Sequence, residues 1–326
     1  MQRKYSWTLT RYLDDFLIIL PPNSETEQQS QQFIDICNKV GFSEAADKRK
    51  DGTCVNYLRL ILDTVKMEAK LLENKKKRAL DGIQYILTRD FVTHRDLEKL
   101  LGLLEFCVSV FPLGQPFLRH VWNMFYKSSP RKQRLTVAAR RDLLWWREFL
   151  PVWAGTSIIQ SERAQVHIAT DASGKKGIGG VWFEGSQLFS TRLPRRHHPK
   201  HINWKELFAV KYAFANWSDK WVNTRVIVFC DNTTVVRGIN KRSIQGAAIK
   251  PLQNLFLLAA RRNIEVAAIW VPSKANVLAD ALSRFDMNTV ANLVGKQLAN
   301  SLPRRQNSMI RSKISHHMQP FISTTD

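Results

Sequence analysis

The sequence predicts an α/β protein in which a mainly helical segment separates two regions that contain strands. Residues 11–20 (RYLDDFLIIL) form an apolar run interrupted by two acids, a pattern typical of a strand, a tight turn and a second strand. Residues 71–150 carry apolar side chains at helical spacing. From about residue 165 onward, β-branched runs alternate with helical patterns, which favours a sheet covered by helices.

The region before residue 71 continues after this hairpin with one helix and one strand-forming run. Residues 24–41 are predicted to form the helix, because Ser24 and Glu27 have the spacing of a capping box and an apolar stripe follows them. Residues 55–65 (VNYLRLILDTV) are rich in residues that favour strands.

The helical segment is punctuated by recognisable start and stop signals. A basic run at 75–78 opens one helix, and Thr93 is expected to cap the next. Pro112 and Pro116 end that second helix, and a further helix through RRDLLWWREFL stops at Pro151.

The second strand-containing region has a regular order of elements. We predict three strands within HIATDAS and IGGVWFEGSQLFSTRL, and then a helix, a buried strand, two helices, a strand and a final helix. These last six elements are expected at 203–218, 225–230, 234–240, 247–262, 264–271 and 275–284. Residues 286–326 are polar and basic, and we expect them to be a disordered tail.

Composition restricts the class of partner and the setting. The chain of 326 residues has a formal net charge of +21 and a pI near 10.1, which favours a polyanion such as nucleic acid over an ordinary solvated basic surface. The cysteines form no Cys-x-x-Cys pair, and neither a membrane-spanning run nor a signal peptide is recognisable. We therefore expect no membrane partner and an intracellular location, in the cytoplasm or the nucleus.

Four acids in the second strand-containing region lie where α/β proteins place function. Asp171 and Asp231 end predicted strands, Glu206 lies in the first turn of the helix opened by Asn203, and Asp280 lies in the last helix. Carboxylates that converge there repel one another unless cations neutralise them. Two Mg²⁺ ions can do this and can clamp a phosphodiester for attack by water.

Each of these acids also has an ordinary structural interpretation. Glu206 could complete a capping box with Asn203, and Asp231 and Asp171 could start turns. Asp280 could face solvent. The conjunction of all four at element boundaries within a basic region favours the metal site.

The motifs that hold these acids resemble, in order, those of retroelement ribonuclease H domains. They are TDAS, NWKELFAV, VFCDN and WVPSKANVLADALSR. The resemblance covers about residues 160–285. It implies a five-stranded mixed sheet flanked by helices, and cleavage of the RNA strand of an RNA/DNA hybrid.

The resemblance also implies roles for the acids. Asp171 would bridge two Mg²⁺ ions, for which Mn²⁺ could substitute. Glu206 and Asp231 would complete one site, and Asp280 would help to hold the ion that carries the nucleophilic water. Many cellular members of the family have a histidine in the loop before the last acid, and the loop at 272–276 has none. We expect slower turnover for that reason and an intact metal site.

Basic and amide residues near the motifs are predicted to contact the nucleic acid. These are Arg195, Arg196, Lys200, Asn203, Asn232 and Lys274. Three histidines upstream of Glu206 leave two interpretations open, a zinc cluster or a solvated loop that faces phosphate. They are His197, His198 and His201.

With such a domain downstream, RYLDDFLIIL resembles the YxDD hairpin of a reverse transcriptase palm, in which Asp14 and Asp15 would bind metal. YLRLILDT at 57–64 resembles the primer-grip hairpin, with Arg59 where the family usually has glycine. The following helical segment resembles the thumb and connection of tyrosine-recombinase retrotransposons, the DIRS-like and Ngaro group. A helical bundle with a tryptophan-rich core is the alternative.

A reverse transcriptase palm needs a third carboxylate from an earlier strand, and residues 1–11 contain no acid. We expect the fingers and the first part of the palm to be missing from this chain.

The predicted organisation is a partial palm at 1–70, a helical thumb and connection at 71–159, a ribonuclease H-like domain at 160–285 and a basic tail at 286–326. The predicted function is metal-dependent hydrolysis of RNA in RNA/DNA hybrids. Two alternatives remain open. One is a non-catalytic nucleic-acid-binding remnant. The other is a polymerase part completed by an upstream polypeptide, since DNA synthesis by this chain alone is not expected.

Overall fold

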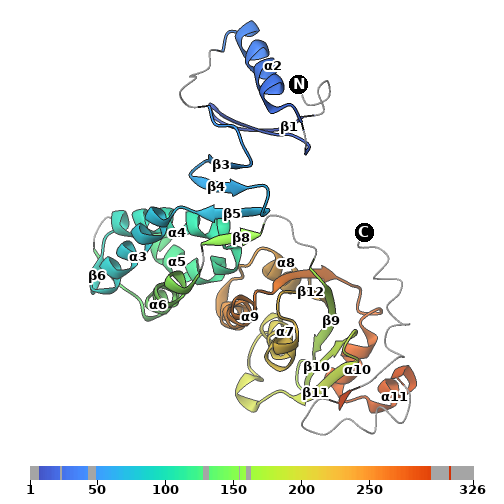
Figure 1. Cartoon of the computed structure of the whole chain (residues 1–326). Coiled ribbons are helices and arrows are strands. Elements are labelled where there is room, and N and C mark those ends of the chain that lie inside the picture. Colours follow the sequence, from blue (N-terminus) through green and yellow to red (C-terminus); the bar gives the residue numbers. More distant parts are fainter. Residues whose placement is uncertain are drawn as a thin grey trace.

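The computed structural model describes residues 7–22, 24–42, 49–127, 132–153, 155–158, 163–294 and 308–309. Figure 1 follows the chain from an amino-terminal hairpin and its helix, through a small sheet and a helical bundle, to a large domain in which helices cover a mixed sheet. No helix within these described residues is long and apolar enough to cross a bilayer.

The amino-terminal unit begins with the predicted hairpin. Strands β1 (Thr8–Tyr12) and β2 (Asp15–Ile19) are antiparallel, with Tyr12 opposite Asp15. Leu13 adopts the left-handed conformation, at φ 54, that the tight turn requires. The strand–turn–strand prediction for this stretch is confirmed.

Helix α2 (Thr26–Lys39) packs against the hairpin through the ring of Phe33. Trp7 and Phe16 both contact this ring edge-on. The predicted capping box at its start is wrong. Glu25 is the N-cap and makes no side-chain bond, while the Ser24 hydroxyl donates to the Pro21 carbonyl. The carbonyl of Pro21, three residues before Ser24, thus offers the Ser24 hydroxyl a local turn that competes with capping.

A four-stranded antiparallel sheet follows the amino-terminal unit. Its order is β3 (Cys54–Tyr57), β4 (Leu60–Asp63), β5 (Glu68–Leu71) and β8 (Thr156–Ile158). Strand β8 comes from the far end of the helical segment and was not predicted. It binds there because the edge of β5 is open, and the Leu71 amide also donates to the Gly155 carbonyl.

The segment between Glu73 and Val152 is mainly helical, as predicted, and its helices pack into a bundle. Thr93 caps its second helix in a capping box with Asp96, and the helix ends just before Pro112. Pro151, however, lies inside the last turn of the final helix instead of stopping it, because a proline there removes only one backbone hydrogen bond. The elements are α3 (Glu73–Leu87), β6 (Phe91–Val92), α4 (His94–Val110), η2 (Pro112–Leu118), α5 (Arg119–Lys127), β7 (Gln133–Arg134) and α6 (Val137–Val152).

The large domain holds the predicted mixed sheet. Strands β9 (Gln165–Ala172), β10 (Gly177–Trp182) and β11 (Gln187–Arg192) are antiparallel, and β12 (Arg225–Cys230) and β13 (Glu265–Trp270) add parallel to β9. The strand order is β13-β12-β9-β10-β11, which confirms the five-stranded mixed sheet with flanking helices. The two-residue strand β14 (Ser308–Met309) extends the β11 edge.

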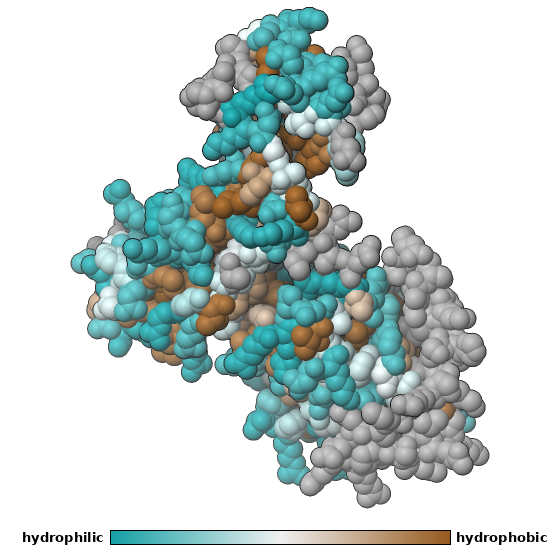
Figure 2. Space-filling view, in the orientation of Figure 1, coloured by the Kyte–Doolittle hydropathy of each residue, from teal (hydrophilic) through white to brown (hydrophobic). Residues whose placement is uncertain are grey.

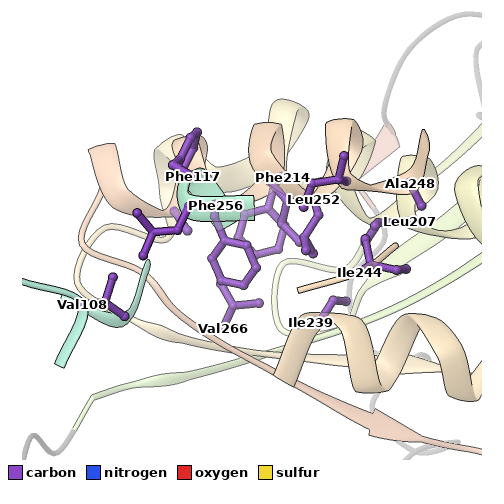
Figure 3. Packing of buried hydrophobic residues seen from close by; sticks show 14 of the residues in the cluster. Val108, Phe117, Leu207, Phe214, Ile239, Ile244, Ala248, Leu252, Phe256 and Val266 are labelled. Carbon is purple, nitrogen blue, oxygen red and sulfur yellow. The ribbon is translucent and has the colours of Figure 1, made fainter. Parts of the chain in front are cut away.

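Helices cover both faces of this sheet. The helices are η3 (Arg195–His197), α7 (Ile202–Trp217), η4 (Ser218–Lys220), α8 (Thr233–Asn240), η5 (Gly246–Ala248), α9 (Ile249–Arg261), α10 (Val277–Arg284) and α11 (Met287–Val294). One hydrophobic cluster joins α7, α8 and α9 to the sheet and to the helical bundle, and a second lies under α10 and α11. In Figure 3, Phe256, Phe214 and Leu252 pack together, with Phe117 of the bundle close by.

The expected disordered tail is wrong for its first part, because residues 287–294 form α11. Val290 and Val294, one helical turn apart, are buried in the cluster under α10. This apolar pair gives the helix a face to bury. The two residues of β14 also lie in the range of the expected tail, and its other positions after 294 lie outside the described residues.

Candidate active site

Two of the predicted acids reach the same level at the centre of the sheet. Strands β9 and β12 are parallel, and Ala169 lies opposite Phe229. Asp171 and Asp231, each two residues further along, therefore emerge side by side at the same end of neighbouring strands.

Asp171 is 5% exposed, although it is a charged residue type. Burial, and then the nearby Asp280 and Asp231, raise its pKa to about 6, against the lowering effect of a hydrogen bond from Ser283 and of the charge on Arg284. A divalent cation at this position would remove the repulsion and favour the ionised carboxylate.

Glu206 lies on the helix that covers this end of the sheet. Helix α7 begins at Ile202, so Glu206 is in its second turn, not the first turn as predicted. The capping-box interpretation is excluded because the cap is His201, whose Nδ1 accepts from the amide of Asn203 at 3.2 Å. The helix instead carries Glu206 to the sheet, where only 4% of it is exposed.

The carboxylate of Glu206 is incompletely satisfied. Burial is the main cause of a pKa raised well above the ordinary value, and Asp171, Asp231 and Asp280 raise it further, while the amide of Ala172 donates to it and lowers it. Its Oε2 has no hydrogen-bond partner among the described residues. A buried carboxylate oxygen without a donor is costly unless a cation binds it.

Asp231 is held by the loop before α10. Ser273 donates its hydroxyl to Oδ2 of Asp231 at 2.7 Å, and the indole of Trp270 donates to the Asp231 backbone carbonyl at 3.0 Å. One ligand atom each from Glu206, Asp231 and the adjacent Cys230 lie within 4.8 Å of one another. The pKa of the Cys230 thiol is raised well above its ordinary value, first by burial and then by Glu206.

Asp280 joins the acids because α10 approaches the sheet unusually closely. Gly179 of β10 lies opposite Asp171, and a Cβ at this glycine would lie 2.5 Å from the Leu282 Cβ and the Ser283 amide. Asn276 fixes the start of the helix by donating to the Thr170 carbonyl at 3.0 Å. The side chain of Asp280 remains 40% exposed.

The same Asp280 carboxylate pairs with Arg284 one turn later, at 2.7 Å. The solvent-facing interpretation of Asp280 therefore holds only in part, since this acid also raises the pKa of Asp171.

The predicted nucleic-acid contacts lie around this end of the domain. Arg195, Arg196 and Lys200 are exposed on η3 and the turn after it, and Lys274 is exposed in the loop before α10. Asn203 and Asn232 lie at the starts of α7 and α8 and are joined by a hydrogen bond of 2.9 Å. Their contact with nucleic acid stays a prediction.

The zinc-cluster interpretation of the three histidines has no support within the described residues. The His197 ring packs at a tilted angle against Trp204, with ring centroids 4.6 Å apart, and His198 Nε2 contacts the Leu193 carbonyl at 2.9 Å. His201 caps α7. Each ring has a separate local partner, and the one metal-binding group in the described part of the chain contains no histidine.

Asp14 and Asp15 lie apart from this site, Asp14 in the turn of the amino-terminal hairpin and Asp15 at the start of β2, and both are exposed. Within the described residues, no third acid joins them in a metal-binding group.

Sequence reasoning missed several residues that build the site: Cys230, Gly179, Ser273, Asn276 and Ser283. Only Cys230 carried a usable signal, because it ends the strand directly before Asp231.

The solved structures that this chain is similar to include reverse transcriptases and ribonucleases H. A foamy viral protease–reverse transcriptase in complex with double-stranded DNA is 14% identical, with a TM-score of 0.39, over 81% of this chain and 46% of that one. The ribonuclease H1 of Halobacterium salinarum is 18% identical, with a TM-score of 0.32, over 38% of this chain and 99% of that one.

The amino-terminal ribonuclease H domain of a Mycobacterium tuberculosis protein is 20% identical, with a TM-score of 0.31, over 36% of this chain and 95% of that one. This chain spans about half the length of the viral protein. No protein-family model matches the sequence. No curated protein matches it either.

Proposed function

We propose that this chain hydrolyses the RNA strand of RNA/DNA hybrids in a reaction that depends on divalent metal ions. The observation that carries the proposal is the convergence of four carboxylates, two of them almost fully buried, at one end of the central strands. Such a cluster is costly in the absence of cations and becomes favourable when cations bind. The choice of hybrid as substrate rests on the resemblance of the four motifs.

The donor set fits Mg²⁺, which prefers oxygen ligands. Glu206 and Asp231 would hold one ion, Asp171 would be shared, and Asp280 would help to hold a second. When bound, two such ions polarise the phosphodiester and supply a water of lowered pKa as the nucleophile. Ser273 and Asn276 would act as positioning residues, since one fixes the Asp231 carboxylate and the other fixes the start of α10.

The substrate would approach over the exposed basic residues of η3. Arg195, Arg196 and Lys200 can neutralise backbone phosphates, so the affinity for hybrid should fall steeply as salt rises. Charge reversal of Arg195 and Arg196 together should flatten the slope of log affinity against log salt. A slope near zero for the unaltered chain would contradict a role for its positive charge in binding.

The decisive experiment compares Glu206→Gln with Glu265→Gln on a labelled hybrid in Mg²⁺. Glu265 begins β13, at the end of the sheet opposite to Asp231, and therefore serves as a matched acid outside the site. Glu206→Gln should slow cleavage at least about a thousandfold, or roughly 4 kcal/mol in the barrier. Single-stranded RNA and duplex DNA should remain intact.

The same variant separates catalysis from folding. Removing a buried charge that neighbouring acids repel should leave Glu206→Gln at least as stable as the unaltered chain in a chelating buffer. Cleavage by Glu206→Gln at the unaltered rate would refute the proposal. Hybrid binding with no cleavage in either Mg²⁺ or Mn²⁺ would instead support the non-catalytic binding module.

We also propose that the hairpin of Asp14 and Asp15 is a polymerase element that requires a further carboxylate from another polypeptide segment. The exposed turn and the absence of a third acid beside it in the described residues support this. A tyrosine-recombinase retrotransposon of the DIRS-like or Ngaro group remains the proposed source. Primer extension on an RNA template by this chain alone would contradict the polymerase proposal.

A further inference from the structure

The acid cluster includes the thiol of Cys230, a ligand that a metal coordinated only by oxygen atoms does not need. Cys230 is the last residue of β12, is fully buried, and places its sulfur within 4.8 Å of ligand oxygens from Glu206 and Asp231. Its sulfur accepts a weak hydrogen bond from the amide of Asn232 at 3.4 Å. Nothing in the proposed hydrolysis uses this thiol.

A second observation points to a cation at the same place. Oε2 of Glu206 is buried and unpartnered among the described residues, and its residue is only 4% exposed. The neighbouring polar groups leave both carboxylates with spare acceptor capacity. Asp231 accepts from Ser273 through Oδ2, and Glu206 accepts from the amide of Ala172. These interactions orient the carboxylates and leave oxygen lone pairs available for a metal.

The spacing suits a small tetrahedral ion. Zinc binds sulfur at about 2.3 Å and carboxylate oxygen at about 2.1 Å, so at the tetrahedral angle a sulfur and an oxygen on one ion lie about 3.6 Å apart. The ligand atoms of Glu206, Cys230 and Asp231 lie within 4.8 Å of one another, so they would have to approach by at most about 1 Å. Small side-chain rotations close such a gap.

We propose that Glu206, Cys230 and Asp231 form a site for a thiophilic divalent cation such as Zn²⁺ or Cd²⁺, which competes with Mg²⁺ and inhibits the chain. Mg²⁺ prefers oxygen and makes no use of the thiol, whereas Zn²⁺ and Cd²⁺ gain a sulfur ligand. The thiol releases its proton when the metal–sulfur bond forms, and the metal changes no oxidation state. Inhibition rests on the proposed function, but binding of the cation does not.

Cadmium binding tests the site without any cleavage assay. The background is the full chain with Cys37→Ser and Cys54→Ser, which removes the two cysteines that are not buried. Titration with Cd²⁺ should give the ultraviolet charge-transfer band of a cadmium–thiolate bond. This band should disappear in Cys230→Ser and persist in Cys107→Ser, a matched buried cysteine in α4. A band of unchanged affinity in Cys230→Ser would overturn the proposal.

Two carboxylate variants test whether the oxygens belong to the same site. Asp231→Asn and Asp280→Asn each remove one negative charge from the cluster, but only Asp231 is in the trio with the thiol. Asp231→Asn should weaken Cd²⁺ binding by about tenfold or more, and Asp280→Asn by clearly less. Equal weakening would indicate a general charge effect and would refute the three-ligand site. These variants also keep the proposal testable if Cys230→Ser fails to fold.

The inhibition assay follows on the hybrid, with each variant compared with its own zinc-free rate in Mg²⁺. Zinc should inhibit the Cys107→Ser control at a concentration about tenfold or more below that needed for Cys230→Ser. Equal sensitivity of these two variants would overturn the inhibitory role. An absence of cleavage in all zinc-free samples would count against the proposed function, while the cadmium titration would still decide the site.

Discussion

Two regions of this protein carry acids beside apolar strands, and they differ in what surrounds those acids. In the amino-terminal unit, Asp14 and Asp15 lie in an exposed turn, and α2 has no buried residue. In the sheet domain, Asp171 and Glu206 are about 95% buried. Figure 2 shows some apolar residues at the surface of the amino-terminal unit. Tyr12 and Leu13 of this unit are 59% and 76% exposed. An acidic motif thus becomes a chemical site only where other elements pack around it.

The two regions also differ in how extensively they pack against the rest of the molecule. The sheet domain shares a hydrophobic cluster with the helical bundle, and Gln253 of α9 donates to Asp142 of α6 at 2.8 Å. Among the described residues before Leu71, only Trp7 is a buried hydrophobic residue. We therefore expect substitutions in the sheet domain to have large effects and comparable substitutions in the amino-terminal unit to have small ones.

The largest effect is expected from Gly179→Ala. The added methyl group would lie within 2.6 Å of the Ala279 carbonyl and closer still to Leu282, so α10 has to move away from β10 and carry Asp280 with it. A displacement of about 1 Å can cost about a hundredfold in rate, and overpacking destabilises by about 1–3 kcal/mol. Cleavage rates and thermal unfolding measure both effects.

Gly174→Ala is the control, because a Cβ at this position meets nothing within 4 Å. Equal activity in the two glycine variants would mean that the close approach of α10 does not position Asp280.

The second prediction concerns the attachment of the sheet domain. Asp142 is 2% exposed and accepts from the His120 amide at 3.0 Å as well as from Gln253. Asp142→Ala removes a buried acceptor from these half-buried donors, which should lower the free energy of unfolding by about 3 kcal/mol. Denaturant unfolding measures this, and Asp15→Ala in the exposed turn should change stability by less than about 0.5 kcal/mol. Similar losses in both variants would contradict the contrast between the regions.

The third prediction is a pH dependence that follows from the raised pKa of Asp171. Its pKa rises from 3.8 to about 6 on folding, so the folded state binds more protons than the unfolded state between these values. Stability in a chelating buffer should therefore fall as pH rises from about 4 to 6, by at most about 3 kcal/mol.

Asp171→Asn should flatten this fall, and Mg²⁺ should oppose it in the unaltered chain. The measurement is the free energy of unfolding as a function of pH, with Asp15→Asn as the exposed control. A profile for Asp171→Asn that parallels the unaltered chain would show that this carboxylate is not under strain.

The smallest effect is expected in the hairpin of β3 and β4. Leu58 and Arg59 occupy its turn at φ 48 and φ 66, in the left-handed region that costs a non-glycine residue about 1–2 kcal/mol. Arg59→Gly should stabilise the chain by about 0.5–1 kcal/mol, since the greater freedom of glycine in the unfolded state offsets part of the gain. Thermal unfolding measures the shift, and destabilisation would mean that the Arg59 side chain makes a contact worth more than the strain.

The sequence alone determined the type and order of most of the longer elements, because each has its own periodicity, whereas β5, β8, α5 and α11 were not predicted. The pair of acids within an apolar run located the amino-terminal hairpin, and Thr93 located the start of α4. The predicted mixed sheet formed because its β-branched strands can be buried only between helices. The predicted helix boundaries at Ser24 and Pro151 differ from those in the structure. The Ser24 hydroxyl makes a local hydrogen bond to Pro21 instead of capping α2, and Pro151 in the last turn of α6 removes only one backbone hydrogen bond.

What the tertiary structure alone decided is which distant residues meet. No sequence spacing indicates that the missing side chain of Gly179 allows α10 to approach β10 closely, that β8 pairs with β5, or that Cys230 lies beside the Glu206 carboxylate. These contacts depend on strand register and helix packing, which are set jointly by residues far apart in the chain. The raised pKa values of Asp171 and Glu206 likewise arise from burial by several elements together. The sequence therefore determined which acids to examine, and only their convergence in a low-dielectric site decided which of them have a raised pKa.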